Sequence, residues 1–192
     1  MTAQVLDPRS TALVAIDLQN GIVAMSTQPH ASRDVVSRTS SIAAKLRGLG
    51  GTIVFVRVTN AADGLDALAP ITDAPPAPVA ARPPEWSTLV AELGQQESDI
   101  VVTKRQWGAF YGTELDLQLR RRGVTTIILV GIATHVGVES TARDAFERGY
   151  QQIFVEDATS SPSGPAHAHC FSVVFPRMGR VRKTDEVLAM LG

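Results

Sequence analysis

Short apolar runs alternate along the chain with longer segments in which apolar residues recur at the spacing of one helix face. The run at residues 126–130 is unbroken, as expected for a strand buried on both faces of a parallel sheet. Together the runs predict six strands, at residues 11–16, 52–58, 100–103, 126–130, 152–157 and about 180–182. The segments between them predict helices at about 32–49, 114–122, 138–148, 166–175 and 185–190. This alternation predicts a three-layer α/β/α sandwich on a six-stranded, mainly parallel sheet that binds ligands at its carboxyl edge.

The pattern weakens between residues 60 and 86. Six of the 11 prolines lie in this segment, at positions 70, 75, 76, 78, 83 and 84. Because proline fixes φ and removes a hydrogen-bond donor, we expect neither a strand nor a linker between domains here, but an ordered or semi-ordered excursion. It is a candidate for a lid over the site or for a contact between subunits.

Composition narrows the range of partners. A chain of 192 residues with 44% hydrophobic content is of the size that one domain handles, so we expect a single domain over residues 1–192. With 18 basic and 19 acidic side chains and a net charge of −1, the chain has no general attraction for nucleic acid or an anionic membrane. We therefore expect a small-molecule substrate and no nucleic-acid or membrane partner.

The cysteine count bears on the compartment. The single cysteine, Cys170, excludes an intrachain disulfide framework and a multi-cysteine zinc site. No early apolar stretch follows a basic start, as it would in a signal peptide. We expect a cytoplasmic protein.

Polar residues at the ends of the predicted strands are the candidates for chemistry. Asp17 follows the first strand and Lys104 follows the third. Taken alone, Asp17 is typical of a turn residue and Lys104 of a solvated side chain. Taken together, they are expected to converge at one edge of the sheet. The fourth strand runs into the turn Gly131–Gly137 and then a helix, where backbone N–H groups can hold a small anion.

These segments resemble the isochorismatase-like hydrolase family, which includes the cysteine hydrolases, and the resemblance extends along nearly the whole chain. Asp17 matches the family's acidic residue and Lys104 its lysine. Gly137 stands where the larger branch of the family carries its nucleophilic cysteine. The resemblance implies a Rossmann-like fold, a hydrolase activity and a homo-oligomer, which we expect to be a dimer or tetramer.

The glycine excludes thiolate attack from position 137. Cys170 lies on a different predicted helix in an apolar pattern, and we expect it to be a small buried side chain. In the family, a glycine at this position also occurs in true isochorismatases, which hydrolyse a vinyl ether without a covalent enzyme intermediate. The chain keeps their histidine as His135, but has Ala133 and Thr134 where they tend to carry Tyr-Ala.

We therefore predict a hydrolase for a small anionic or carbonyl-bearing substrate, with vinyl-ether hydrolysis as the first candidate reaction. Asp17 is the expected general acid, and Lys104 the second catalytic residue. An aspartic acid with a pKa near 3.9 is protonated in about one part per thousand at pH 7, which costs roughly 4 kcal/mol, so this role requires burial to raise the pKa. The alternatives are a catalytically silent binding protein and a water-mediated amide hydrolase.

Substrate contacts are expected from Gln19, Phe110, Ala133, Thr134, His135 and Gly137. His135 either orients a substrate carboxylate or bonds a backbone carbonyl in the turn. From the resemblance, we expect a non-proline cis peptide between Ala133 and Thr134. The chain lacks the Asp-x-His pattern of the family's zinc-dependent branch, and His167 and His169 are expected to point to different sides of a helix, so we predict no metal and no cofactor.

Overall fold

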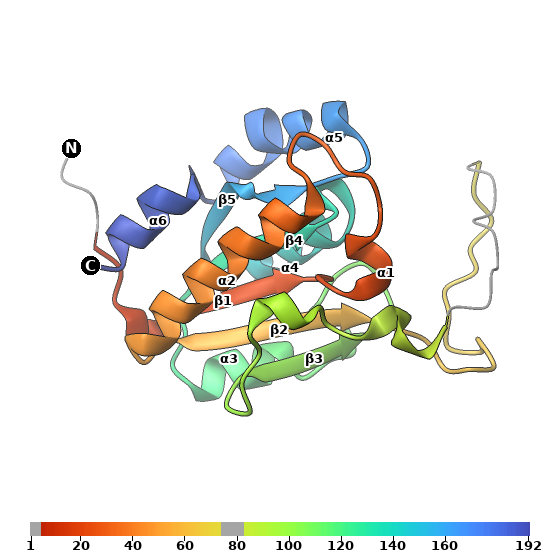
Figure 1. The fold of residues 1–192 in the computed structure, drawn as a ribbon, viewed down its shortest axis with the longest axis horizontal. Coiled ribbons are helices and arrows are strands. Elements are labelled where there is room, and N and C mark those ends of the chain that lie inside the picture. The colour runs from red at the N-terminus through yellow and green to blue at the C-terminus, as the bar shows by residue number, and fades with distance from the viewer. Residues whose placement is uncertain (1–4, 74–82) are drawn as a thin grey trace.

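The computed structural model describes residues 5–73 and 83–192, which form one six-stranded parallel sheet between two layers of helices (Figure 1). The strand order is β3-β2-β1-β4-β5-β6. The strands are β1 (Thr11–Ile16), β2 (Thr52–Val58), β3 (Ile100–Lys104), β4 (Thr126–Ile132), β5 (Gln151–Ser160) and β6 (Arg180–Arg182). The architecture is the predicted α/β/α sandwich on a six-stranded parallel sheet.

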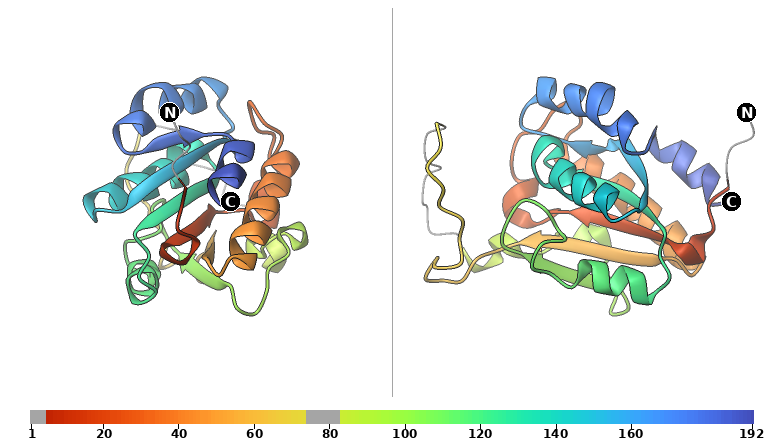
Figure 2. Two further views of the ribbon diagram at one scale, coloured as in Figure 1. Left: turned by 90° about the vertical axis from the view of Figure 1, so that its left-hand side faces the viewer. Right: turned by 180° about the vertical axis from the view of Figure 1, so that it is seen from behind.

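Helices cover both faces of the sheet. They are α1 (Asn20–Val23), α2 (Ser32–Gly48), α3 (Leu115–Arg121), α4 (Glu139–Glu147), α5 (Gly164–His169) and α6 (Thr184–Met190). The buried residues of α2 and α6 share one hydrophobic cluster, and those of α3 and α4 share the other. Figure 2 shows α3 and α4 in front of the sheet when the molecule is seen from behind. Among the described residues, no helix is long and apolar enough to cross a membrane.

The central strand β1 shows why a strand in the middle of this sheet is mainly apolar. All six of its residues are buried. Leu13 and Ala15 belong to the cluster on the α2 side, whereas Val14 and Ile16 belong to the cluster on the α4 side. Because successive side chains of a strand point to opposite faces, a strand covered on both sides places its alternate side chains in two hydrophobic clusters.

The order of the strands fixes the place of the site. From β1 the chain proceeds outward to β2 and β3, and then returns to place β4 on the other side of β1. Parallel α/β sheets bind ligands at such a reversal, beyond the carboxyl ends of the strands. This point lies between β1 and β4.

All six predicted strands are confirmed, with differences at their ends. The strand β5 continues to Ser160, and β4 continues to Ile132. The helix predicted from Val138 is preceded by a turn of π-helix at Thr134–Val138. The helix predicted at 166–175 is divided into α5, a π-helical turn at Cys170–Val174 and a 3-10 turn at Phe175–Arg177.

The proline-rich segment leaves the body of the protein at the carboxyl edge of the sheet. Residues 60–73 contain no helix or strand and extend away from that edge (Figure 1), and a 3-10 turn follows at Pro84–Ser87. Pro75, Pro76 and Pro78 lie outside the described residues. A role as a lid or subunit contact stays a prediction.

Candidate functional site

Asp17 and Lys104 meet in a buried ion pair at the carboxyl edge of the sheet. Asp17 follows β1 and has a left-handed backbone with φ 55°, whereas Lys104 is the last residue of β3. The Lys104 Nζ atom lies 2.8 Å from Asp17 Oδ2 and donates a hydrogen bond of 2.6 Å to the carbonyl oxygen of Trp107. The two side chains are 1% and 8% exposed for Lys104 and Asp17, so the charges are screened little by water.

Burial changes the protonation of Asp17. Desolvation raises the pKa of its carboxyl group to about 6, although the charge of Lys104 and its hydrogen bond act in the opposite direction. Among residues 5–73 and 83–192, no group hydrogen-bonds the other carboxyl oxygen, Oδ1, which is itself buried. Buried polar atoms normally have a partner, so Oδ1 is available to a molecule bound beside it.

Gly137 completes this arrangement from the π-helical turn that follows β4. A Cβ atom built on Gly137 would lie 3.1 Å from both Asp17 Oδ2 and Lys104 Nζ, and 2.9 Å from a methyl group of Ile16. The ion pair therefore lies directly against the backbone of residue 137. The two catalytic positions and the nucleophile position inferred from the sequence meet at one point.

These residues line a cavity of about 510 Å³. Its wall includes apolar side chains, among them Ile22, Met25 and Trp107, and also the charged Arg105. His135 lines the same cavity, and its Nδ1 atom lies 2.7 Å from Ser161 Oγ, so its partner is a hydroxyl group and not the backbone carbonyl considered above. A second hollow of about 650 Å³ beside α1 and α2 contains none of the three central residues, and we therefore place the chemistry in the smaller cavity.

Of the expected substrate contacts, Ala133, His135 and Gly137 lie on this wall, whereas three others lie elsewhere. The Gln19 amide is buried and bonds the backbone N–H and carbonyl of Val58, at 2.8 and 3.0 Å. Phe110 packs in the core beside the ring of Tyr150. Thr134 is fully buried, and its hydroxyl group lies 2.8 Å from His167 Nδ1. Each of these three side chains contacts other residues of the protein and does not line the cavity.

Two further expectations concern backbone and thiol. The non-proline cis peptide lies between Ile132 and Ala133, so its predicted place one bond later is wrong. Cys170 is buried as expected, and its thiol group donates to Glu139 Oε2 at 3.1 Å. Burial raises the pKa of this thiol to about 12, which keeps it protonated at neutral pH.

Some features were missed from the sequence. Met25 and Ile22 reach the cavity from the irregular segment after β1, where no periodicity marks their direction. The sequence indicated only weakly that Arg105 lines the cavity, because this residue directly follows Lys104. Outside the cavity, the metal-ligating side chains of His30, Glu156 and His167 come together, although no spacing motif joins them in the sequence.

Comparison with known proteins identifies the family of this chain. Residues 11–186 match the model of the isochorismatase domain. The chain is 47% identical over 186 residues to the uncharacterised isochorismatase family protein YecD of Escherichia coli O157:H7, covering 97% of this chain and 98% of that protein. It is 33% identical over 196 residues to the ureidoacrylate amidohydrolase RutB of Methylobacterium radiotolerans, covering 85% of this chain and 72% of that protein. An isochorismatase family protein from Burkholderia thailandensis superimposes with a TM-score of 0.94 at 47% identity, with 99% of both chains covered. The chain is therefore a member of the isochorismatase family of hydrolases.

Proposed function

We propose that this protein hydrolyses a small anionic or carbonyl-bearing molecule in the cavity beside Asp17, without a covalent cysteine intermediate. The observation that carries the proposal is the Asp17 carboxyl group, which is buried, has a raised pKa and keeps one oxygen without a partner among the described residues. Such a group can give and take a proton near neutral pH. The cavity that Asp17 and Gly137 line offers space for the reacting part of a substrate and for water.

The first candidate reaction is the hydrolysis of a vinyl ether. Asp17 donates its proton to the terminal vinyl carbon, and the ether oxygen stabilises the resulting cation. The Asp17 carboxylate then takes a proton from the water that adds to this cation, and the hemiketal product collapses to a carbonyl compound and an alcohol. Asp17 ends with the proton that it started with, so the cycle balances.

The raised pKa lowers the free-energy cost of using Asp17 as an acid at neutral pH. At pH 7, a carboxyl group with a pKa of about 6 is protonated in roughly one molecule in ten, at a cost of about 1.4 kcal/mol. The ordinary aspartic acid considered from the sequence would require about 4 kcal/mol. Burial thus removes most of the free energy needed to protonate Asp17 at pH 7.

The cavity wall favours a substrate with a negative charge. Arg105, His135 and Lys104 line it, and within the protein Arg105 pairs with Asp66 and Lys104 with Asp17. A carboxylate or another anion can pair with these groups while the apolar wall covers the rest of the molecule. The same donors can polarise a carbonyl oxygen.

A second candidate is amide hydrolysis by an activated water molecule. It is favoured by the similarity to a protein described as a ureidoacrylate amidohydrolase. In this reaction Asp17 must start ionised and act as a base toward water, while Lys104 stabilises the charge. The two reactions thus need opposite protonation states of one residue.

The pH profile separates these reactions. With a panel of enol ethers, kcat/KM is expected to fall as the pH rises above about 6, because the acid form of Asp17 is lost. With a panel of ureido compounds and small amides, base catalysis predicts that kcat/KM rises through the same pH. The measurement is initial rates of both panels between pH 4.5 and 9.

Variants test the role of Asp17 itself. Asp17→Asn is expected to lower kcat/KM by about 10²- to 10⁴-fold. The matched control is Asp185→Asn, which changes an exposed aspartate on α6. Undiminished turnover by Asp17→Asn would reject the proposal. Binding of panel compounds in the cavity without any turnover would instead identify a catalytically silent binding protein.

A further inference from the structure

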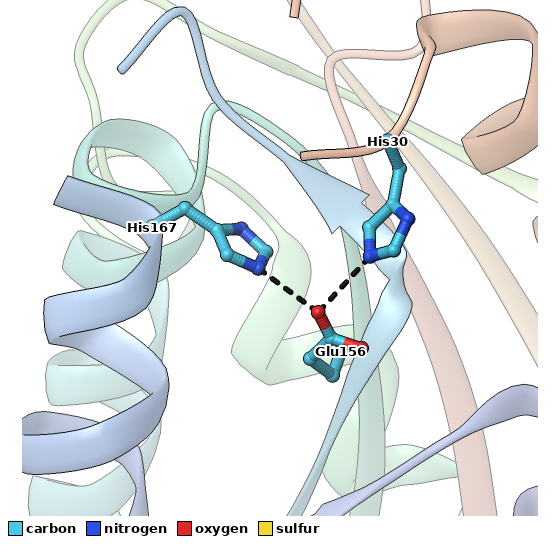
Figure 3. Close-up of side chains that lie close together, drawn as sticks. All are labelled: His30, Glu156 and His167. Atoms are coloured by element: carbon cyan, nitrogen blue, oxygen red, sulfur yellow. Dashed lines mark hydrogen bonds and ion pairs between the residues drawn. The ribbon is translucent and has the colours of Figure 1, made fainter. Parts of the chain in front are cut away.

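Three side chains from distant parts of the chain converge outside the cavity of Asp17. His30 comes from the loop between α1 and α2, Glu156 from β5 and His167 from α5. Glu156 Oε1 lies 3.0 Å from His30 Nε2 and 3.4 Å from His167 Nε2. Figure 3 shows the carboxylate between the two imidazole rings, with both Nε2 atoms directed at the same oxygen.

An irregularity in β5 places Glu156 there. Leu129 of β4 pairs with Phe154 and Gly131 pairs with Thr159, so residues 155–158 of β5 stand opposite Val130 alone. A bulge of this kind redirects side chains that regular pairing would place against the neighbouring layers. Glu156 is therefore partly exposed, although the four residues before it, 152–155, are buried.

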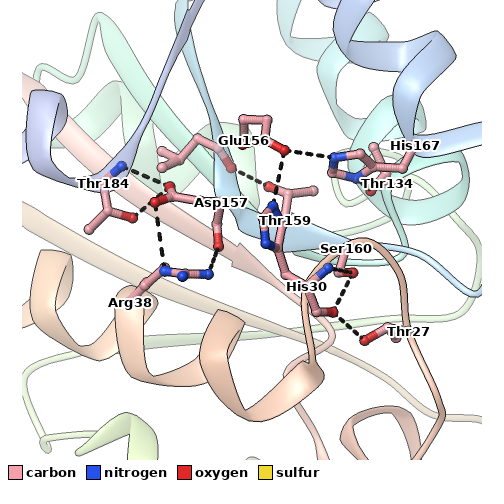
Figure 4. A network of polar contacts seen from close by, with 11 residues as sticks. Thr27, His30, Arg38, Thr134, Glu156, Asp157, Thr159, Ser160, His167 and Thr184 are labelled. Carbon is pink, nitrogen blue, oxygen red and sulfur yellow. Dashed lines mark hydrogen bonds and ion pairs between the residues drawn. The ribbon is translucent and has the colours of Figure 1, made fainter. Parts of the chain in front are cut away.

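Hydrogen bonds hold the backbone around this cluster (Figure 4). The hydroxyl group of Ser160 accepts from the His30 N–H at 3.3 Å and donates to the His30 carbonyl at 2.7 Å. Beside Glu156, the carboxylate of Asp157 accepts two bonds of 2.8 Å from Thr184, and Arg38 donates to the Asp157 carbonyl at 2.7 Å. Two of the three converging residues thus lie on backbone that is fixed from outside the cluster.

We propose that His30, Glu156 and His167 bind one divalent transition-metal ion of the zinc type. Two imidazole nitrogens and one carboxylate oxygen are a donor set of open zinc sites, in which water or another molecule completes the coordination. Neighbouring ligands of a tetrahedral ion at about 2.1 Å lie about 3.4 Å apart. The two spacings from Glu156 Oε1, 3.0 and 3.4 Å, are already close to that value.

The remaining spacing requires a small movement. All three donor atoms lie within 4.8 Å of one another, so the two histidine nitrogens must approach by about 1.4 Å at most to reach tetrahedral spacing. The His30 side chain is 23% exposed, so its ring can turn while its backbone stays bonded to Ser160. Glu156 is 26% exposed, so an ion can enter from solvent.

The buried ligand has a supporting contact of the kind that metal-bound histidines have. His167 Nδ1 lies 2.8 Å from Thr134 Oγ1, and both residues are buried. With the metal on Nε2, the Nδ1–H group donates to Thr134. Without a metal, Nε2–H donates to Glu156 and the threonine hydroxyl donates to Nδ1. Metal binding therefore reverses the hydrogen bond to Thr134, in the same π-helical turn as Gly137.

The test is binding of Zn²⁺ alone to the untagged protein after treatment with a chelator, followed by calorimetry. One equivalent of Zn²⁺ is expected to bind, and His30→Asn and Glu156→Gln are each expected to weaken binding by more than roughly tenfold. The matched control is His169→Asn, an exposed histidine two residues after His167 on α5, which is expected to bind as the original protein does. Circular dichroism checks that each variant is folded.

A second measurement needs no variant. The chain has four histidines, so nitrogen NMR of protein labelled at its histidine rings can follow each ring during the titration. The expected result is that Zn²⁺ shifts Nε2 of two rings and moves the proton of His167 from Nε2 to Nδ1. The proposal would be overturned by any of three results: no Zn²⁺ binding, binding by His30→Asn and Glu156→Gln as tight as by the original protein, or ring shifts confined to His135 and His169. The three side chains would then be a hydrogen-bonded cluster only. Because the readout is binding, failure of the proposed hydrolysis would not affect it.

Discussion

At the scale of single residues, the site depends on a competition at Asp17. Burial favours the neutral carboxyl group, whereas the ion pair with Lys104 favours the carboxylate, and the outcome is a pKa of about 6. Folding raises this pKa above the ordinary value of 3.8. The contribution of Asp17 to the stability of the fold is therefore fully present below pH 3.8, and it is lost as the pH rises through about 6.

Removing the cation should shift this balance. In Lys104→Met, the pKa of Asp17 is expected to rise above about 6, because the opposing charge and hydrogen bond are gone while burial remains. Carbon NMR of labelled aspartate carboxyl groups measures the midpoint. The exposed Lys183→Met serves as the control, and an unchanged or lower midpoint in Lys104→Met would contradict this account of the pair.

Substitutions of Gly137 test the space beside the ion pair. In Gly137→Ala, the new Cβ lies about 3.1 Å from Asp17 Oδ2 and Lys104 Nζ and takes up space beside the ion pair. We therefore expect turnover of any substrate identified with the two panels to fall at least about tenfold. The free energy of unfolding should fall by about 1–3 kcal/mol, measured by urea denaturation. Gly48→Ala is the control, since a Cβ there has no neighbour within 4 Å.

Gly137→Cys has the same Cβ and adds a thiol group next to Asp17 and Lys104. We expect it to gain amidase activity that Gly137→Ala lacks, because the acid and the ammonium group are placed to activate the thiol. Rates with ureido compounds and small amides measure the gain. Equal rates in the two variants would mean that the remaining groups are not aligned for thiol chemistry.

At the scale of elements, α4 connects the π-helical turn to the loop after β3. The Thr141 hydroxyl donates to the Gly137 carbonyl at 2.7 Å and accepts from the Ala109 N–H at 3.1 Å. That loop also carries the Trp107 carbonyl to which Lys104 donates. The buried Thr141 hydroxyl group thus links the π-helical turn to the loop after β3.

Thr141→Val should loosen this connection. The Ala109 N–H would lose its partner, and the free energy of unfolding is expected to fall by about 1–3 kcal/mol, measured with urea. The exposed Thr125→Val is the control. A change below about 0.5 kcal/mol would indicate that the hydroxyl group does not hold the loop.

The elements also show what a sequence can reveal. The central strands were predictable because they are mainly apolar runs covered on both faces, and strand ends then located Asp17 and Lys104. The directions of Gln19, Phe110 and Thr134 depend on partners far away in the chain, so they could not be predicted. The bulge that turns Glu156 outward likewise leaves no mark in the local pattern.

At the scale of the whole molecule, the association of subunits is still a prediction. Leu65, Leu68 and Ile71 are 88%, 70% and 105% exposed on the segment that extends from the carboxyl edge. We expect a dimer or tetramer in which this segment contacts a second copy, because burying these side chains removes apolar surface from water.

Light scattering after size-exclusion chromatography measures the assembly. Leu65→Glu with Ile71→Glu is expected to lower the mass to that of smaller species, whereas Leu117→Glu, an exposed leucine on α3, should leave it unchanged. A monomer in the original protein at micromolar concentration would contradict the prediction.

The strand order described above also governs how the protein regains activity after denaturation. The strand pair β1 and β4 joins Thr11 to Thr126, and only this pairing brings Gly137 to Asp17. Pairings between such distant parts of a chain form slowly and late. Recovery of turnover in a refolding experiment should therefore lag behind the return of helical signal, and it would report completion of the sheet across its centre.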